Sequence, residues 1–468
     1  MKTFIQNGLC VTSSGTLAAD VLIDGEKIAA VLDRGSAVKA DTAVPADAEV
    51  IDATGKYVLP GGIDVHTHME MPFGGTFSAD TFETGTRAAA WGGTTTIIDF
   101  AVQAKGTSLL ATLDKWHGKA DGNCDIDYGF HMIVSDVNES SLKEMAACVD
   151  AGVTSFKMFM AYPGVFYSTD GEILLAMQQA ATIGATVMMH AENGIAIDQL
   201  VAQALAAGRG DPVEHGLTRP PELEGEATSR AIVLARVASC PLYIVHLSAS
   251  QALDAVAEAR DAGQNVFAET CPQYLYLSIE DLARPDFEGA KFVASPPLRP
   301  RSHQDSLWRG LRTNDLSVVS TDHCPFCFKD QKELGRGDFS KIPNGMPGVE
   351  HRMDLLHQGV VAGQLTLPRW VETCCTTPAR MFGLYPRKGV IAAGSDADIV
   401  LYDPAATQTL GVATHHMNVD YSAYEGMPIT GRVDTVFSRG RAVIRAGAYV
   451  GSGGHGQFLA RGLNGYLV

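Results

Sequence analysis

The chain has 468 residues, of which 46% are hydrophobic and 19% charged, a composition typical of a globular protein with a large buried core. This composition excludes intrinsic disorder and fibrous repeats. The 36 basic and 53 acidic residues give a formal net charge of −17, which repels phosphate backbones and anionic lipid surfaces, so nucleic acid is not an expected partner.

Short β-rich runs separated by Gly, Asp and Asn turns occupy the start of the sequence, residues 4–51. The same alternation returns near the other end, within residues 389–443. We therefore predict a β-sandwich domain built from residues 1–56 and 388–450. The tail, residues 451–468, is Gly-rich and weakly patterned, which predicts either a disordered end or an arm that orders on a neighbouring subunit.

Between these regions, eight β-rich runs each precede a helix-like segment rich in Ala and Leu. The runs are residues 58–65, 94–100, 128–134, 155–160, 186–189, 242–245, 265–269 and 316–319. Eight β-then-α units in series are typical of a (β/α)₈ barrel. We predict an α/β fold in which residues 57–387 form a TIM-like barrel beside the sandwich.

The sequence carries no signal for a membrane span or for disulfide bonds. The longest uncharged stretch, residues 173–191, is interrupted by polar residues and by Gly184, which predicts a helix, a turn and a buried strand. The nine cysteines follow no framework spacing, which favours reduced thiols in a cytoplasmic protein. Cys324 and Cys327 form a single CxxC pair. We interpret them as loop and packing residues, because a zinc ribbon would need a second pair.

Histidines follow several of the predicted barrel strands, at the end where barrel active sites lie. His66 and His68 follow the first strand, and residues two apart in an extended segment point the same way, so both imidazoles are expected to face the barrel mouth. His190 ends the fifth strand, His246 ends the sixth, and Asp322 follows the eighth. Each histidine alone is more often a satisfied core residue, but the five groups together predict a metal centre.

Lys157 offers a group that this metal centre otherwise lacks. Four neutral imidazoles and one carboxylate have donors for two divalent ions, but nothing among them bridges the ions. Lys157 lies within the fourth predicted strand, where an ammonium facing the barrel interior is costly to bury. Carbamylation by carbon dioxide would turn its amine into an anion with two metal-binding oxygens. The alternative is an unmodified lysine paired with a strand-end carboxylate.

Seven segments carry these residues and further polar groups. They are His66-Thr-His68, Phe156-Lys-Met-Phe-Met-Ala-Tyr162, His190-Ala-Glu-Asn193, His246-Leu-Ser248, Ser295-Pro-Pro-Leu-Arg299, Ser320-Thr-Asp-His-Cys-Pro-Phe326 and Asn344-Gly-Met-Pro-Gly-Val-Glu350. Together they resemble the dihydropyrimidinase and D-hydantoinase family of cyclic amidohydrolases. The resemblance covers essentially the whole chain, and several matching segments are far more specific than one motif.

The resemblance implies a cofactor and an assembly. It implies two Zn²⁺ ions per chain in a barrel that carries a flanking β-sandwich, within a homotetramer. The implied ligands are His66, His68 and Asp322 for the more buried ion, His190 and His246 for the other, and carbamylated Lys157 with a hydroxide as bridges.

The resemblance also implies contacts to a small cyclic amide substrate. Tyr162 would donate its phenol to the developing oxyanion, and Ser295 and Asn344 would bind the ring imide through backbone groups. The pocket around the ring substituent matches Phe73, Phe159 and Phe166, for which plain core packing is the alternative. Pro163 stands where relatives often have a basic residue, so the resemblance does not fix the path of the loop after Tyr162.

The activity that the resemblance implies is hydrolytic ring opening of 5,6-dihydrouracil or 5,6-dihydrothymine, which gives an N-carbamoyl-β-amino acid. Two zinc ions that share a water lower its pKa from about 16 towards about 7, which makes hydroxide available at neutral pH. Asp322, a ligand beside this hydroxide, is the expected carrier of its proton to the departing ring nitrogen.

Other functions are compatible with parts of this pattern. A D-hydantoinase acting mainly on 5-substituted hydantoins is the first alternative, followed by an allantoinase or a dihydroorotase. A dihydroorotase needs a cation for the substrate carboxylate, and Pro163 removes one candidate. A non-catalytic scaffold of the same fold is a different class, but such relatives lose metal ligands, and all the ligand positions are present here.

Overall fold

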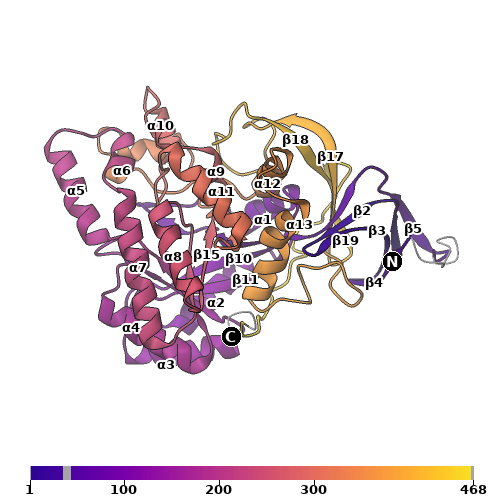
Figure 1. Cartoon of the computed structure of the whole chain (residues 1–468), viewed down its shortest axis with the longest axis horizontal. Coiled ribbons are helices and arrows are strands. Elements are labelled where there is room, and N and C mark those ends of the chain that lie inside the picture. Colours follow the sequence, from indigo (N-terminus) through magenta and orange to yellow (C-terminus); the bar gives the residue numbers. More distant parts are fainter. Residues whose placement is uncertain (1, 35–43, 465–468) are drawn as a thin grey trace.

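The computed structural model describes residues 2–34 and 44–464, which form a barrel with a separate sheet at one side (Figure 1). Eight parallel strands make the barrel, in the order β16-β15-β14-β13-β12-β11-β10-β7. Their bounds are β7 Gly62–Thr67, β10 Thr94–Val102, β11 Asp127–Ile133, β12 Ser155–Phe159, β13 Thr186–His190, β14 Leu242–Ile244, β15 Val266–Thr270 and β16 Val318–Val319. A parallel bridge between Thr67 and His323, beyond β16, brings the two ends of this sheet together. The predicted fold class is confirmed.

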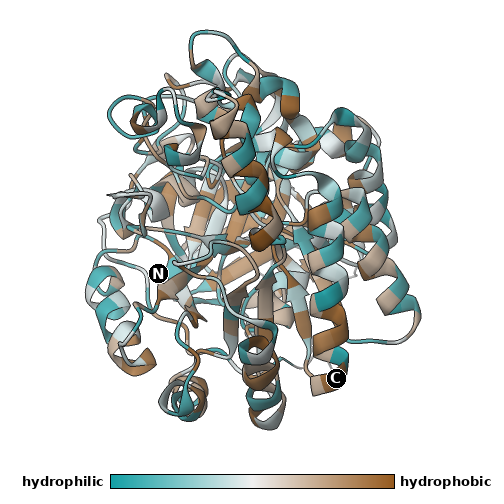
Figure 2. Cartoon of the chain, turned by 90° about the vertical axis from the view of Figure 1, so that its left-hand side faces the viewer, coloured by the Kyte–Doolittle hydropathy of each residue, from teal (hydrophilic) through white to brown (hydrophobic). Residues whose placement is uncertain are grey.

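The barrel strands are buried on both faces, which explains their continuous apolar runs. Every residue of β11, β12 and β13 is buried. Successive side chains alternate between two cores: Met188 packs inside the barrel, while Val187 and Met189 pack under the helices. Figure 2 accordingly shows hydrophobic strands at the centre with helices around them.

Helices follow the strands and cover the barrel. They are α1 Phe82–Trp91, α2 Leu109–Ala120, α3 Glu139–Asp150, α4 Asp170–Ile183, α5 Gly194–Ala206, α6 Val213–Leu217, α7 Pro221–Ala238, α8 Ser250–Asp261, α9 Pro272–Tyr276, α10 Ile279–Leu282, α11 Gln304–Thr313, α12 Arg352–Val361, α13 Leu367–Val371 and α14 Thr377–Met381. Helix α4 begins at a capping box between Thr169 and Glu172 and ends at Gly184, whose φ of 73° terminates it before β13. The helix, turn and strand predicted here are confirmed. Within the described ranges, none of the helices has the length and apolar character needed to cross a membrane.

A ten-stranded sheet from the two ends of the chain forms the second part of the structure. Its strands are β1 Lys2–Gln6, β2 Leu9–Thr12, β3 Gly15–Asp24, β4 Lys27–Asp33, β5 Ala48–Asp52, β6 Tyr57–Pro60, β17 Ile399–Thr409, β18 Pro428–Ser438, β19 Arg441–Arg445 and β20 Ala448–Tyr449. Their order is β20-β19-β18-β17-β6-β2-β3-β1-β5, with β4 on β3. The turn between β3 and β4 contacts the turn between β18 and β19, since an added Cβ at Gly440 would lie 2.0 Å from Gly25 O. These strands are far apart in the order, so the sheet folds over on itself.

The run 58–65, predicted as one strand, is two strands in different sheets. Its first part is β6, which pairs antiparallel with β17, and its second part lies in β7 of the barrel. Gly61 separates them at a close contact, where an added Cβ would lie 2.0 Å from Thr95 Oγ1. The chain therefore passes from one sheet to the other at a position where the packing admits only glycine.

The tail packs against the barrel of its own chain over the described residues 451–464. Tyr128 N donates to Gln457 O at 3.0 Å, and Leu459 N donates to Tyr128 O at 2.7 Å. The side chain of Leu459 is fully buried, and Arg461 donates to Ser155 Oγ at 2.9 Å. Neither alternative from the sequence anticipated this placement, because the few apolar residues that anchor the tail are dispersed among glycines. Residues 465–468 lie outside the described residues.

Candidate active site

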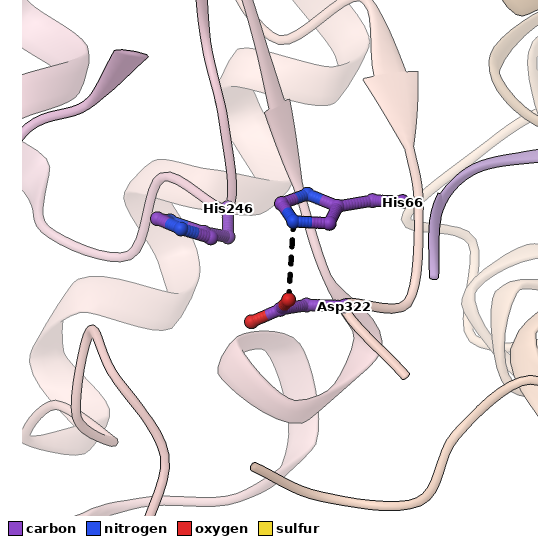
Figure 3. Close-up of side chains that lie close together, drawn as sticks. All are labelled: His66, His246 and Asp322. Atoms are coloured by element: carbon purple, nitrogen blue, oxygen red, sulfur yellow. Dashed lines mark ion pairs between the residues drawn. The ribbon is translucent and has the colours of Figure 1, made fainter. Parts of the chain in front are cut away.

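The predicted metal ligands converge at the carboxyl end of the barrel strands. His66 Nε2 lies 3.1 Å from Asp322 Oδ1, and His68 Nε2 lies 3.2 Å from the same oxygen. Lys157 Nζ lies 2.8 Å from His66 Nε2. Figure 3 shows His66, His246 and Asp322 close together, and their ligand atoms all lie within 4.8 Å of one another.

His190 and His246 form the other side of this group. His190 Nδ1 lies 2.9 Å from His246 Nε2, and the rings of His66 and His246 are 5.2 Å apart between centroids. His246 and Asp322 have positive φ values, 40° and 51°, although neither is glycine. Such a backbone is costly and concentrates at functional sites, where surrounding structure holds it in place.

One pocket joins the predicted ligands to the predicted substrate residues. All of them line it except His66, which is completely buried behind it. The lining residues are His68, Met71, Phe73, Lys157, Phe159, Tyr162, Phe166, His190, His246, Ser295, Asp322, Cys324, Asn344 and Gly345. Cys324, predicted to pack beside Asp322, is a buried part of this wall, and Cys327 is half-buried outside it.

Aromatic rings form the outer wall of the pocket. Phe159 and Phe166 are stacked with centroids 5.0 Å apart, and Phe73 is parallel to Phe166 at 6.2 Å. Phe159 is 4% exposed, so it is both a packed residue and a lining residue. The two interpretations of these phenylalanines, core packing and pocket wall, are therefore compatible.

Tyr162, Ser295 and Asn344 line the same pocket as the histidines and Asp322. Asn344 Nδ2 donates to Ser295 Oγ at 3.1 Å. Burial raises the pKa of Tyr162 to about 12, so its phenol keeps the proton at neutral pH. After Tyr162 the chain makes a compact turn that accommodates Pro163, in which Val165 N and two following amides donate to Tyr162 O at 3.0–3.1 Å.

Burial sets the charge state of the site. It lowers the pKa values of His66, His68 and His246, so these imidazoles are neutral and keep a lone pair for a metal. Burial also lowers the pKa of Lys157 to about 8, although Asp322 opposes this effect. More of the Lys157 amine is therefore uncharged at neutral pH than in an exposed lysine, and the uncharged amine is the form that reacts with carbon dioxide.

Comparison with known proteins agrees with this geometry. The chain matches the amidohydrolase family over residues 57–443. The chain belongs to the amidohydrolase family. A D-hydantoinase of Streptomyces coelicolor is 66% identical over 468 residues, with 100% of this chain and 99% of that protein covered. The crystal structure of dihydropyrimidinase from Brevibacillus agri superposes with a TM-score of 0.96 at 52% identity, covering 99% of each chain. An L-hydantoinase (dihydropyrimidinase) structure from Arthrobacter aurescens has a TM-score of 0.88 at 32% identity, covering 98% of this chain and 99% of that one.

The donors of this amidohydrolase fit a divalent metal. His68 Nδ1 and His246 Nδ1 are buried and have no hydrogen-bond partner within the described residues. Imidazole nitrogens with one carboxylate are donors that zinc accepts. Among the described residues, the cluster of histidine and carboxylate ligands that meets one point is His66, His246 and Asp322.

Two carboxylates that hold the histidines were not singled out from the sequence. Glu269, completely buried at the end of β15, contacts His66 Nδ1 and accepts from His246 N at 3.1 Å and Tyr243 Oη at 2.9 Å. Glu192 Oε2 lies 2.8 Å from His190 Nε2. Each fixes a ring so that its other nitrogen faces the centre of the site. The position of Glu269 in the sequence could have indicated its role, because it ends the seventh predicted strand just as the histidines end theirs.

Proposed function

We propose that this amidohydrolase opens the ring of cyclic ureides by hydrolysing a ring amide. The observation that carries the proposal is the single pocket in which the histidine–Asp322 cluster faces Tyr162, Ser295 and Asn344. The names of similar proteins, D-hydantoinase and dihydropyrimidinase, support substrates of two ring sizes. These are 5,6-dihydropyrimidines, which give N-carbamoyl-β-amino acids, and hydantoins, which give N-carbamoyl-α-amino acids.

The proposed cofactor is a pair of Zn²⁺ ions. His66, His68 and Asp322 would hold the more buried ion, His190 and His246 the other, and Lys157, as a carbamate, would bridge them. The short contact from Lys157 Nζ to His66 supports this role. When bound, such metals lower the pKa of a water towards about 7 and polarise a carbonyl oxygen. Elemental analysis is expected to find about two zinc ions per chain. If protein produced with zinc available contained no metal, this would contradict the proposal.

The other steps of the reaction are assigned to backbone groups and side chains of the pocket. The backbone at Ser295 and Asn344 orients the ring so that its amide carbonyl faces Asp322. Asp322 accepts the proton of the attacking water and delivers it to the departing ring nitrogen. The Tyr162 phenol donates to the carbonyl oxygen as negative charge develops there, and a preorganised donor of this kind stabilises the transition state by about 2.7–4 kcal/mol.

A specific observation favours 5-substituted hydantoins as a second substrate group. Beyond the reaction pocket, Phe73, Tyr162 and Phe166 continue into an outer groove with the apolar side chains Phe77 and Val165. An apolar wall suits an alkyl or aryl ring substituent, which dihydrouracil lacks. The substituent would therefore add binding energy without changing the chemistry at Asp322.

Turnover of four rings by the zinc-loaded protein tests the proposal. We expect opening of dihydrouracil, hydantoin and a 5-alkylhydantoin, and no opening of allantoin. Preference for the alkylated hydantoin over hydantoin would support the outer groove as the substituent site. No turnover of any of the first three at full zinc occupancy would contradict the proposed function.

We also propose a cytoplasmic homotetramer. All nine cysteines are unpaired thiols, which is characteristic of a reducing compartment. Leu175 of α4 and Val233 and Val237 of α7 are 51–66% exposed on two neighbouring helices, an apolar surface that a second copy would cover. Sedimentation equilibrium is expected to give four times the chain mass, and a monomer at micromolar concentration would contradict the assembly.

A further inference from the structure

Lys332 is a buried lysine outside the proposed ligands and ring-binding groups. It begins a short 3₁₀ helix, Lys332–Gly335, and none of its surface is exposed. Its Nζ atom donates to three backbone carbonyls, Val293 O at 2.8 Å, Pro343 O at 2.7 Å and Gly345 O at 2.7 Å. In the part of the chain that the structure describes, no carboxylate lies within 4.0 Å of this ammonium. The three carbonyls therefore take the place of a counter-ion.

The number of carbonyls defines the charge state that this arrangement needs. An ammonium has three N–H donors and a neutral amine has two, so all three bonds form only when Lys332 is charged. Burial lowers the pKa of Lys332 to about 7, and the three carbonyl dipoles act against that effect by stabilising the charged form. Burial of a charge that has no carboxylate partner is costly in free energy, so we expect the buried ammonium of Lys332 to have a specific role.

The three carbonyls belong to the two segments that carry the proposed ring-binding residues. Val293 lies two residues before Ser295, and Pro343 and Gly345 flank Asn344. The segments also contact each other, because Gly345 N donates to Val293 O at 3.0 Å and Asn344 Nδ2 donates to Ser295 Oγ at 3.1 Å. Lys332 thus joins both sides of the ring-binding part of the pocket from behind.

The opposite side of the Asn344 segment is held by the chain after β16. An added Cβ at Gly345, whose φ is 151°, would lie 2.1 Å from Cys324 O, so the segment approaches as closely as glycine permits. Cys324 N donates to Met346 O at 3.2 Å. The backbone around Asn344 is therefore fixed between Cys324 on one side and Lys332 on the other.

We infer that Lys332 is a positioning residue that sets the spacing between the backbone of Ser295 and that of Asn344. It does not line the reaction pocket and contacts none of the proposed metal ligands. The inference rests on the proposed function, in which these two backbone segments bind the substrate ring. Loss of the correct spacing weakens ring binding, whereas proton transfer at Asp322 and metal binding are unaffected.

Substitution by methionine tests this role. Lys332→Met removes the charge and all three donors while retaining most of the side-chain volume. We expect kcat/KM for dihydrouracil and hydantoin to fall by about 10- to 100-fold, mainly through KM, with zinc content unchanged. Lys329→Met is the matched control, because Lys329 is an exposed lysine of the same loop. Its KM is expected to equal that of the wild type.

A second variant covers the case in which the methionine variant does not fold. Lys332→Gln keeps two N–H donors and is expected to raise KM by less than Lys332→Met does. An unchanged KM in a folded, zinc-loaded variant would overturn the inference, and so would loss of zinc or a fall confined to kcat. Failure of both variants to fold would assign Lys332 to fold stability alone. Inactivity of the wild type on every ureide contradicts the proposed function instead, so the two failures are distinguishable.

Discussion

Asp322 has two proposed roles, metal ligand and proton carrier, and an amide in its place separates them. Its Oδ1 atom contacts both His66 and His68. Asparagine keeps an oxygen that binds metal more weakly, but it cannot accept a proton. We expect Asp322→Asn to lower kcat by about 10²–10⁴-fold at full zinc occupancy, with a smaller effect on KM. Turnover and zinc content measured on one sample check this, and near-normal turnover would exclude Asp322 as the proton carrier.

Lys157 is expected to be replaceable by an anion from solution. Its side chain is 1% exposed, and its Nζ atom lies over the ring of Phe100 at 4.3 Å and beside His66. Lys157→Ala removes the proposed bridge and leaves a void, so we expect loss of zinc and activity, with partial recovery in formate or acetate. Lys157→Met fills the void and is expected to show no recovery. Full activity of Lys157→Ala without added acid would show that the lysine is merely structural.

Glu269 orients His66, and its charge is expected to support metal binding. Glu269→Gln keeps the shape of the side chain but removes the charge that holds His66 Nδ1. Loss of such a partner typically lowers metal affinity by about 10–100-fold, which competition with a chelator measures. The control is Glu144→Gln, where the carboxylate accepts from Leu109 N between α2 and α3, away from the site. Equal zinc affinity in the two variants would contradict the orienting role.

Some residues of the site can be predicted from the sequence and others cannot, for a physical reason. Histidines at strand ends are conspicuous, because imidazoles recurring at one structural position indicate metal chemistry even without coordinates. Glu269 and Lys332 look like ordinary charged residues, and only tertiary contacts show that both are buried and hydrogen-bonded. Each has a partner more than 20 residues away in sequence, Tyr243 for Glu269 and Val293 for Lys332, which local sequence does not indicate.

At the scale of elements, the barrel strands follow from local pattern and their partners do not. All eight predicted strands are present, since a continuous apolar run bounded by turns suffices to identify a buried strand. The run 58–65 shows the limit of this pattern, because β6 and β7 are separated by one residue, and nothing in the local sequence shows that they join different sheets. The tail shows the same limit, since its pairing with β11 depends on a strand more than 300 residues earlier.

The tail is expected to contribute to stability through Leu459. This side chain is fully buried in the cluster that fills the barrel interior, together with Ile63 and Val65. Leu459→Ala should destabilise the protein by about 2–5 kcal/mol through lost burial and a cavity. Leu463→Ala is the same change at a position that is 49% exposed, and about 0.5 kcal/mol or less is expected there. Equal thermal unfolding midpoints for the two variants would show that the tail adds no packing energy.

At the scale of the whole molecule, a buried ion cluster joins the barrel to the sheet from the chain ends. Its members are Asp127 at the start of β11, Lys388, Asp396 and Asp398 before β17, and Arg439 after β18. Lys388 Nζ lies 2.6 Å from Asp127, 3.0 Å from Asp396 and 2.7 Å from Asp398. Asp127 is at the amino end of its strand, so the two parts are joined opposite the end that carries the candidate site.

This separation predicts that breaking the cluster affects stability and spares catalysis. Lys388→Met removes the ion-pair partner of Asp398, whereas Asp127 keeps Arg439 and Asp396 keeps Lys27 and Arg387. Removal of one partner from a buried ion cluster costs about 3–5 kcal/mol. Lys143→Met is the control, because that lysine pairs with Glu139 on the surface of α3, where an ion pair contributes about 0–1 kcal/mol. The double variant Lys388→Met/Asp398→Asn also removes the charge of Asp398 that the loss of Lys388 leaves uncompensated, so part of the lost stability is expected to return. Thermal unfolding midpoints of all three variants measure the change in stability. At 25 °C, kcat and zinc content are expected to stay at wild-type values, because the proposed metal ligands lie at the other end of the barrel. An unfolding midpoint of Lys388→Met equal to that of Lys143→Met would show that the two parts are held together by their apolar contacts instead of by this cluster.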